Sequence, residues 1–280
     1  MRVIIDSHVH IWNIDKVRYA WPTPDDADLY RNIEPVELKP LLGAAGINGT
    51  VLVQAADHAE ETDYLLEQAK QHEYILGVVG WVPIDRPDEA RRQLEKHAGN
   101  RYFKGVRHLI HCENDPDWLV RPEVLEGLRV LAAYGKTFDV VAVFPNHLRH
   151  VPDVAQQVPG LRMVLDHLAK PPIALGVGME EWAAQLEAAA SHPNVHGKLS
   201  GLNTACDWND WSSDDWRASV EVAMRAFGAE RLMFGSDWPV ANLAGGYERV
   251  WEATNEVLAG LSERERAAVL GGTAKAFYKL

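Results

Sequence analysis

One pattern constrains the fold more than any other. A short apolar run, a polar loop and a stretch with helical spacing follow one another eight times along the chain. Nearly continuous apolar runs are typical of strands that are buried on both faces, and their alternation with helices indicates a parallel sheet. Eight such units at about 35 residues each match the (β/α)8 barrel.

The expected strands are Val3–His10, Thr50–Ala55, Ile75–Val82, Phe103–Leu109, Phe138–Phe144, Arg162–Leu168, Val195–Ser200 and Arg231–Gly235. The expected helices are Pro35–Ala45, Glu60–Gln71, Pro87–His97, Pro122–Tyr134, His147–Val158, Met179–Ser191, Ser213–Phe227 and a final helical region, Gly246–Lys279. A doubly wound open sheet is the alternative, but it usually carries a glycine-rich turn after its first strand, and Ser7-His8-Val9-His10 has no glycine. We therefore expect one α/β domain over residues 1–280, a (β/α)8 TIM barrel.

The charge composition argues against two classes of binding partner. The 28 Lys and Arg against 40 Asp and Glu give a net charge of −12, which argues against nucleic acid and anionic membranes as partners. No run approaches the roughly 20 apolar residues of a membrane span, and Met1–Asp6 leads directly into a strand rather than a signal peptide. Cys112 and Cys206 form no disulfide framework, so we expect free thiols and a cytoplasmic location. The oligomeric state is left open.

Polar residues with catalytic chemistry stand where three of the strands end. Alternation along the first strand predicts that Asp6, His8 and His10 share one face, where two imidazoles can bind one metal ion or one polarised oxygen. The sixth strand ends in Asp166-His167, and Asp237 follows the eighth. Asp237 could instead cap the next helix, and His167 could lie on the surface. In a closed barrel these residues converge, and three His with one carboxylate form a plausible mononuclear zinc site.

Two long loops are expected at the same end of the barrel. Ile11–Glu34 contains Trp12, Tyr19 and Trp21, and Gly201–Ser212 is the second. Long loops in compact domains are often functional, and in TIM barrels the active site lies among the loops that follow the strands.

The chain resembles the amidohydrolase superfamily, in its amidohydrolase 2 branch. The matching segments are Asp6–Trp12, Val53-Gln54-Ala55, Gly105-Val106-Arg107-His108, Leu165-Asp166-His167, Gly197–Gly201 and Phe234–Pro239, in barrel order. The combination is most similar to the sugar-lactone lactonases, such as fuconolactonases and rhamnonolactonases. The resemblance implies hydrolysis of a sugar-acid lactone to the open-chain aldonic acid.

The metal centre implied by the resemblance is single. Many superfamily members bridge two metals with a carboxylated Lys or a Glu on the fourth strand, but Lys104 lies near the start of that strand and the fifth strand has no His. We expect at most one divalent ion, zinc, held by His8, His10, His167 and Asp237. Some related lactonases work without a metal, so we expect activity to survive chelation at least in part.

The implied chemistry assigns roles to named residues. Asp237 is the general base, His8, His10 and His167 orient the water or hold zinc, and Arg107 or His108 donates to the oxyanion. Arg107 and His108 point to opposite faces, so only one is expected to reach the pocket. Asp166 is expected to face the helices. A neutral polyhydroxy substrate is expected, with Trp12, Gln54, Trp81, His108, Asn146, Lys198 and Trp238 as binding residues.

Two other functions stay open from the sequence. A zinc-dependent decarboxylase of an aromatic or muconate-type acid would need side chains that clamp a carboxylate. A non-enzymatic carbohydrate-binding barrel is suggested by the ten Trp residues, although a binding protein has little need of a buried base.

Overall fold

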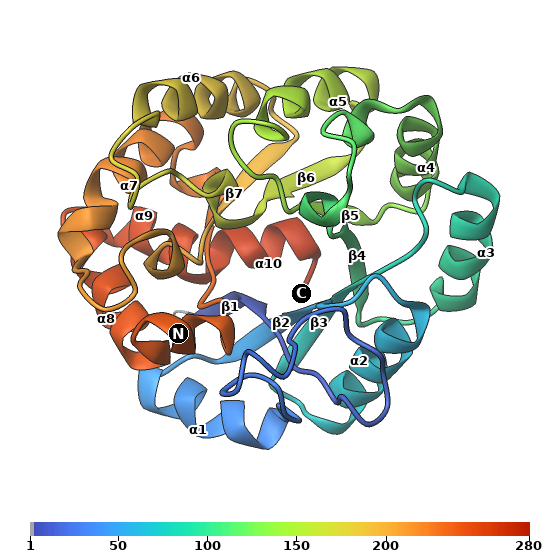
Figure 1. Cartoon of the computed structure of the whole chain (residues 1–280), viewed down its shortest axis with the longest axis horizontal. Helices are drawn as coiled ribbons and strands as arrows, with labels where there is room; N and C mark the ends of the chain where they lie inside the picture. The colour runs from blue at the N-terminus through green and yellow to red at the C-terminus, as the bar shows by residue number, and fades with distance from the viewer. Residues whose placement is uncertain (1–2) are drawn as a thin grey trace.

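The computed structural model describes residues 3–280 and contains one eight-stranded parallel sheet with its strands in sequence order. The strands are β1 (Ile5–Val9), β2 (Gly49–Val53), β3 (Ile75–Gly80), β4 (Phe103–His108), β5 (Thr137–Val140), β6 (Arg162–Leu165), β7 (Val195–Leu199) and β8 (Leu232–Phe234). The sheet curls into a ring that is surrounded by helices (Figure 1). A parallel bridge between Val9 and Trp238 joins the two end strands. The predicted (β/α)8 barrel is confirmed.

The helices begin and end close to the predicted residues. They are α1 (Pro35–Ala45), α2 (Ala59–Gln71), α3 (Pro87–His97), α4 (Pro122–Ala133), α5 (Val151–Gln157), α6 (Met179–Ala190), α7 (Ser213–Phe227), α8 (Gly246–Val257), α9 (Glu263–Ala267) and α10 (Thr273–Tyr278). Proline occupies the first turn of α1, α3 and α4, where no backbone donor is lost. The final helical region is broken, because Ser262 and Glu265 form a capping box that starts α9.

The inside of the barrel is filled by small apolar side chains. Ile5, Val51, Val53, Val79, Val164 and Met233 form one cluster with Ala274, Phe277 and Tyr278 of α10. Helix α10 therefore closes the end of the barrel at which the strands begin, here called the floor. The other end, called the mouth, is left for the loops that follow the strands. The C-terminal residues lie at the floor, away from the mouth, and Met1 and Arg2 lie outside the described residues.

The floor depends on a close backbone approach beside β1. The π-helical segment η8 (Ala268–Gly272) packs against both β1 and β8. A Cβ atom at Gly271 would lie 2.2 Å from the carbonyl oxygen of Val3. Only glycine allows this contact without moving the start of β1.

Within residues 3–280, no helix is long and apolar enough to cross a membrane.

We predict that Gly271→Ala lowers the free energy of unfolding by about 1–3 kcal/mol, the usual cost of forcing an extra methyl group into a packed site. The measurement is urea denaturation. Gly260→Ala is the matched control, because its Cβ would meet nothing within 4 Å. Equal stability of the two variants would contradict this account of the floor.

Candidate active site

A cavity of about 810 Å³ opens at the mouth of the barrel. The loop after β1 supplies five residues of its wall, and the loops after β2 and β4 supply most of the others. It is lined by His10, Arg18, Tyr19, Ala20, Trp21, Ala55, Ala56, Asp57, His58, Arg107, Leu109, His111, Cys112, Val141, His167, Lys170, Asp237 and Val240. The prediction that Ile11–Glu34 lies at the mouth is confirmed, whereas no residue of Gly201–Ser212 lines the cavity.

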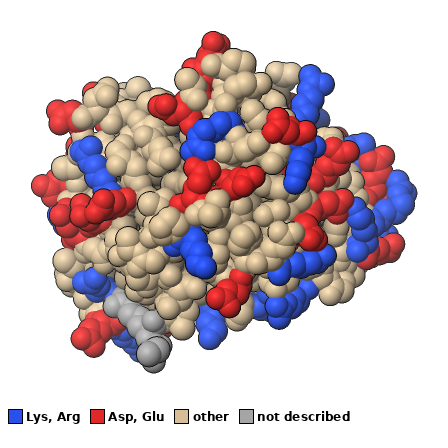
Figure 2. Space-filling model, turned by 90° about the horizontal axis from the view of Figure 1, so that it is seen from below, with Lys and Arg blue, Asp and Glu red and all other residues tan. Residues whose placement is uncertain are grey.

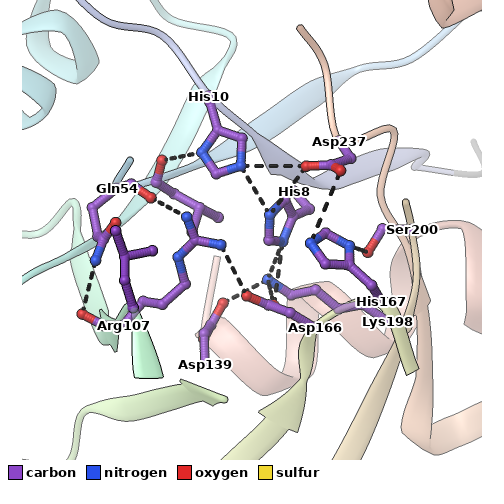
Figure 3. Close-up of polar contacts among 12 residues, drawn as sticks. His8, His10, Gln54, Arg107, Asp139, Asp166, His167, Lys198, Ser200 and Asp237 are labelled. Atoms are coloured by element: carbon purple, nitrogen blue, oxygen red, sulfur yellow. Dashed lines mark hydrogen bonds and ion pairs between the residues drawn. The ribbon is translucent and has the colours of Figure 1, made fainter. Parts of the chain in front are cut away.

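Three imidazoles and one carboxylate meet at the base of this mouth cavity (Figure 3). The Nε2 atom of His10 lies 3.3 Å from Asp237 Oδ1, and that of His8 lies 3.6 Å from the same oxygen. The Nε2 atom of His167 lies 3.9 Å from Asp237 Oδ2. These four residues, here called the His–Asp cluster, come from β1 and from the ends of β6 and β8, as the sequence predicted.

The β1–β8 seam sets the geometry of the cluster. The backbone N–H of Asp237 donates to the His8 carbonyl at 2.9 Å, and the N–H of His10 donates to the Trp238 carbonyl at 2.7 Å. Gly201 allows the close packing of the cluster, since a Cβ atom there would lie 2.6 Å from His167 Nδ1. The barrel closure therefore brings the first and last strands to one reactive centre.

The expectation that Asp6 shares a face with His8 is wrong. The β1–β2 register shifts between Asp6 and Val9, which marks an irregularity of the bulge type that breaks strict alternation. The Asp6 carboxylate accepts from the backbone N–H of Ser236 at 2.9 Å and from the hydroxyl of Tyr247, on α8, at 2.9 Å. Asp6 therefore links the β1–β8 seam to α8, whereas the His8 side chain points into the barrel.

The prediction that Asp166 faces the helices is also wrong. Strand β6 ends at Leu165 and is followed by the turn η4 (Asp166–Ala169). The φ angles are positive at four consecutive residues, from His167 to Lys170. In this left-handed turn the alternation of a strand no longer applies, so Asp166 and His167 both reach the interior. Non-glycine residues adopt this conformation at a cost, and such strain clusters at functional sites.

A buried charge network of Arg107, Asp139, Asp166 and Lys198 lies beneath the cluster (Figure 3). Lys198 Nζ lies 2.5 Å from Asp139 Oδ2, 3.1 Å from Asp166 Oδ1 and 3.0 Å from His8 Nδ1. Arg107 donates to Asp166 Oδ2 at 3.2 Å. Two cations and two carboxylates balance, which offsets the cost of burying each charge. Through Lys198 and Asp166, the network fixes the position of the His8 ring from the floor side of the barrel.

The hydrogen bonds of the imidazoles suit a cation at the cluster. His10 Nδ1 lies 2.8 Å from the Val53 carbonyl oxygen, which can only accept, so Nδ1 carries the proton. In a neutral imidazole the other ring nitrogen, His10 Nε2, then carries a lone pair. His8 Nδ1 lies 3.0 Å from Lys198 Nζ, an ammonium group that can only donate, so the His8 proton sits on Nε2 and is donated to His10 Nε2 at 3.1 Å. A metal ion between the two Nε2 atoms would take the place of that proton, and His8 Nδ1 could then donate to Asp166, 3.3 Å away.

The distances also fit a metal ion. Two ligands of one tetrahedral zinc ion lie about 3.3 Å apart, given the usual zinc–nitrogen bond lengths. Ligand atoms of His8, His167 and Asp237 lie within 4.8 Å of one another, and His10 adjoins two of them. The carbonyl and carboxylate partners of the outer ring nitrogens are typical of the groups that orient metal-binding imidazoles. His8, His167 and Asp237 therefore fit a single ion, and His10 lies beside two of them. Lys104 lies at the floor, bonded to the Lys279 carbonyl.

Electrostatics keeps the cluster in a defined charge state. Burial lowers the pKa of His167 to about 4 and lowers that of His8 well below its ordinary value. Burial alone would raise the pKa of Asp237, but the imidazoles of His167 and His10 outweigh it and hold that pKa below its ordinary value. Neutral imidazoles of His8 and His167 beside an ionised carboxylate are the forms that bind metal or accept a proton.

Arg107, and not His108, reaches the mouth cavity. His108 accepts from Trp81 Nε1 at 3.1 Å, contacts Glu113 at 2.7 Å and stacks on Trp118 with ring centroids 4.2 Å apart. Neither His108 nor Trp81, both predicted to bind substrate, lines the cavity. Their polar atoms are already taken up by one another and by neighbouring loops.

Three other predicted binding residues also lie outside the cavity lining. Trp12 is fully buried and donates to the carbonyls of Leu29 and Arg31. Trp238 is buried at the seam, and Asn146 is exposed. Trp12 and Trp238 are packed in the interior, so neither ring is accessible for stacking on a sugar.

Gln54 and Lys198, also predicted to bind substrate, lie beneath the cavity and outside its lining. Gln54 donates to Asp57 Oδ1 at 2.9 Å and to the Arg107 carbonyl at 3.1 Å. The hydrogen bonds and ion pairs of both side chains are with neighbouring residues.

Other side chains that line the cavity were not among the predicted binding residues. Arg18 and Lys170 line it with no ion pair to any carboxylate of residues 3–280. Trp21 supplies an aromatic face that is 36% exposed. Buried Glu61 accepts from the backbone N–H groups of Ala55 and Ala56, which fixes the wall after β2, and burial raises its pKa to about 8.

The family model described as amidohydrolase matches residues 5–280. The chain belongs to the amidohydrolase family. A protein named L-fucono-1,5-lactonase, from Burkholderia ambifaria, is 37% identical to this amidohydrolase over 99% of the chain and 95% of that protein. A crystal structure of an amidohydrolase from Burkholderia multivorans with bound HEPES matches with a TM-score of 0.92 at 34% identity, over 99% of both chains. A second structure from that species, with bound zinc, matches with a TM-score of 0.89 at 33% identity, again over 99% of both chains.

We predict that Lys198→Met lowers the free energy of unfolding of this amidohydrolase by about 3–5 kcal/mol, because it leaves two buried carboxylates with one cation fewer. The double variant Lys198→Met/Asp139→Asn removes one charge of each sign and should recover part of the loss. Urea unfolding of both variants measures the effect. A single variant as stable as the parent protein would show that the network carries no such charge balance.

Proposed function

We propose that the chain hydrolyses an aldonolactone, the internal ester of a sugar acid, to the open-chain aldonic acid. The observation that carries the proposal is the His–Asp cluster at the base of a cavity, with Arg107 in the same wall. The similarity to a protein named L-fucono-1,5-lactonase over nearly the whole chain supports the substrate class.

Asp237 is the proposed proton acceptor. Its pKa lies below the ordinary value, so it is ionised at neutral pH and can take a proton from water near the imidazoles. Once protonated, Asp237 can return that proton to the ring oxygen as it leaves. A zinc ion held by His8, His10, His167 and Asp237 would lower the pKa of a bound water and polarise the lactone carbonyl.

Arg107 is the proposed donor to the oxyanion. One of its terminal nitrogens is bonded to Asp166 and the other to the Gln54 carbonyl, and its buried Nε has no partner among the described residues. A guanidinium fixed in this way needs no reorganisation when charge develops on the substrate. One such donor typically contributes about 3 kcal/mol to the transition state.

Arg18 and Lys170 are the proposed contacts for the hydroxyl groups of the lactone and for the carboxylate that hydrolysis releases. Both line the cavity, and a cation with no ion-pair partner can bind either group. We place the substrate's polyol part against the loop after β1, beside Trp21.

A proton-release assay over a panel of aldono-1,4- and 1,5-lactones, with and without a chelator, tests the reaction. Hydrolysis of at least one lactone is expected, with activity that survives chelation at least in part. The panel includes an aromatic carboxylic acid with carbon dioxide detection. Decarboxylation without lactone hydrolysis would favour the decarboxylase, and binding without turnover would favour a carbohydrate-binding barrel.

Asp237→Asn should lower kcat by about 10²-fold or more, because it removes the proton acceptor and keeps the size of the side chain. Steady-state kinetics on the best lactone measures this. Asp57→Asn is the matched control, because Asp57 lines the same cavity but makes no contact with the His–Asp cluster. A kcat of Asp237→Asn within a few-fold of that of Asp57→Asn would contradict the assignment.

A further inference from the structure

A second cavity, of about 260 Å³, opens on the floor of the barrel, at the end opposite the His–Asp cluster. Five of its lining side chains are cationic, and none is acidic. The cations are Arg101, Lys104, Lys136, Arg162 and Lys279, and the other lining residues are Ala98, Gly99, Asn100, Phe103, Gly135 and Tyr278. The starts of β4 and β6, the loop before β5 and the end of α10 bring these cations together.

Backbone carbonyls hold three of the cations in place. Lys104 Nζ donates to the Lys279 carbonyl at 2.9 Å, and Lys136 Nζ donates to the Phe103 carbonyl at 2.6 Å. Arg162 donates to the Gly135 carbonyl at 3.1 Å. Carbonyl groups fix the positions of these side chains but leave their full charges in place.

No Asp or Glu side chain of residues 3–280 lies within 4 Å of any of the five cationic groups. On the side shown in Figure 2, by contrast, many Lys and Arg side chains lie next to Asp and Glu. The floor cavity is thus a local excess of positive charge in a chain of net charge −12.

The helix ends at the floor offset only part of this charge. Helices α3, α4 and α10 end beside the cavity, and each C-terminus carries roughly half a negative charge. Mutual repulsion remains. Burial lowers the pKa of Lys104, with a further contribution from Arg101, and burial lowers the pKa of Lys136, with contributions from Lys104 and Lys279.

We propose that the floor cavity binds a small multivalent oxyanion, a molecule with at least two negative charges on phosphate or carboxylate oxygens. Such an ion relieves the repulsion among five cations that the fold already holds around one cavity. A small ion interacts mainly with the five cations that line the floor cavity. A long polyanion such as nucleic acid would extend beyond the Debye length of about 8 Å and meet the acidic remainder of the surface.

Isothermal titration calorimetry of the full chain with inorganic phosphate and, separately, with succinate tests the proposal at 0.15 M salt. Saturable binding of at least one probe is expected. Phosphate binding alone would assign a phosphate ester, and succinate binding alone would assign a carboxylate. Binding of both would support the wider class, and binding of neither would overturn the proposal.

Two double variants locate the site. Lys104→Met/Lys136→Met should weaken binding at least about tenfold, because two charge-assisted contacts are lost. Lys39→Met/Lys70→Met removes the same charge from two exposed positions that line neither cavity and should leave the affinity unchanged. Weakening by this control variant alone, or equally by both variants, would overturn the floor site. If the floor variant does not fold, Arg101→Gln/Lys279→Gln, in which both positions are exposed, repeats the test.

Discussion

The closure of β8 onto β1 is the constraint on which the rest of the site depends. Two backbone hydrogen bonds across this seam place Asp237 opposite His8 and His10, although the residues are more than two hundred positions apart in the chain. Asp6 fastens the same seam to α8. The cluster therefore exists only when the whole barrel is formed, and its chemistry rests on backbone pairing rather than on any local motif.

The fold could be predicted because its signals are periodic. Apolar runs, first-turn prolines and the Ser262–Glu265 capping box mark the elements, and the helices mostly begin and end within one or two residues of the prediction. Strand ends were predicted less well. Val141 and Ala142 continue the apolar run after β5, but they are buried in the wall of the mouth rather than paired in the sheet. Burial in a loop and burial in a strand favour the same residues.

The site could be predicted from the sequence only in part. Its central residues were found because polar groups at strand ends converge in any closed barrel. Asp166 was misplaced because the left-handed turn after β6 contains no glycine to reveal it. Several predicted binding residues do not line the cavity, because a polar side chain near a strand end can bond to a neighbour, as His108 does to Trp81. A signal for the buried charge network was present: Asp139 and Lys198 each interrupt an apolar strand.

A crystal structure with the aldonate product of the best lactone tests most directly the central claim, that hydrolysis occurs at the His–Asp cluster. The account predicts that the product's carboxylate lies within hydrogen-bonding distance of Asp237 or its bound metal and of Arg107, with the polyol chain toward Trp21. A product bound with its carboxylate turned away from Asp237, or bound only outside the mouth cavity, would contradict it.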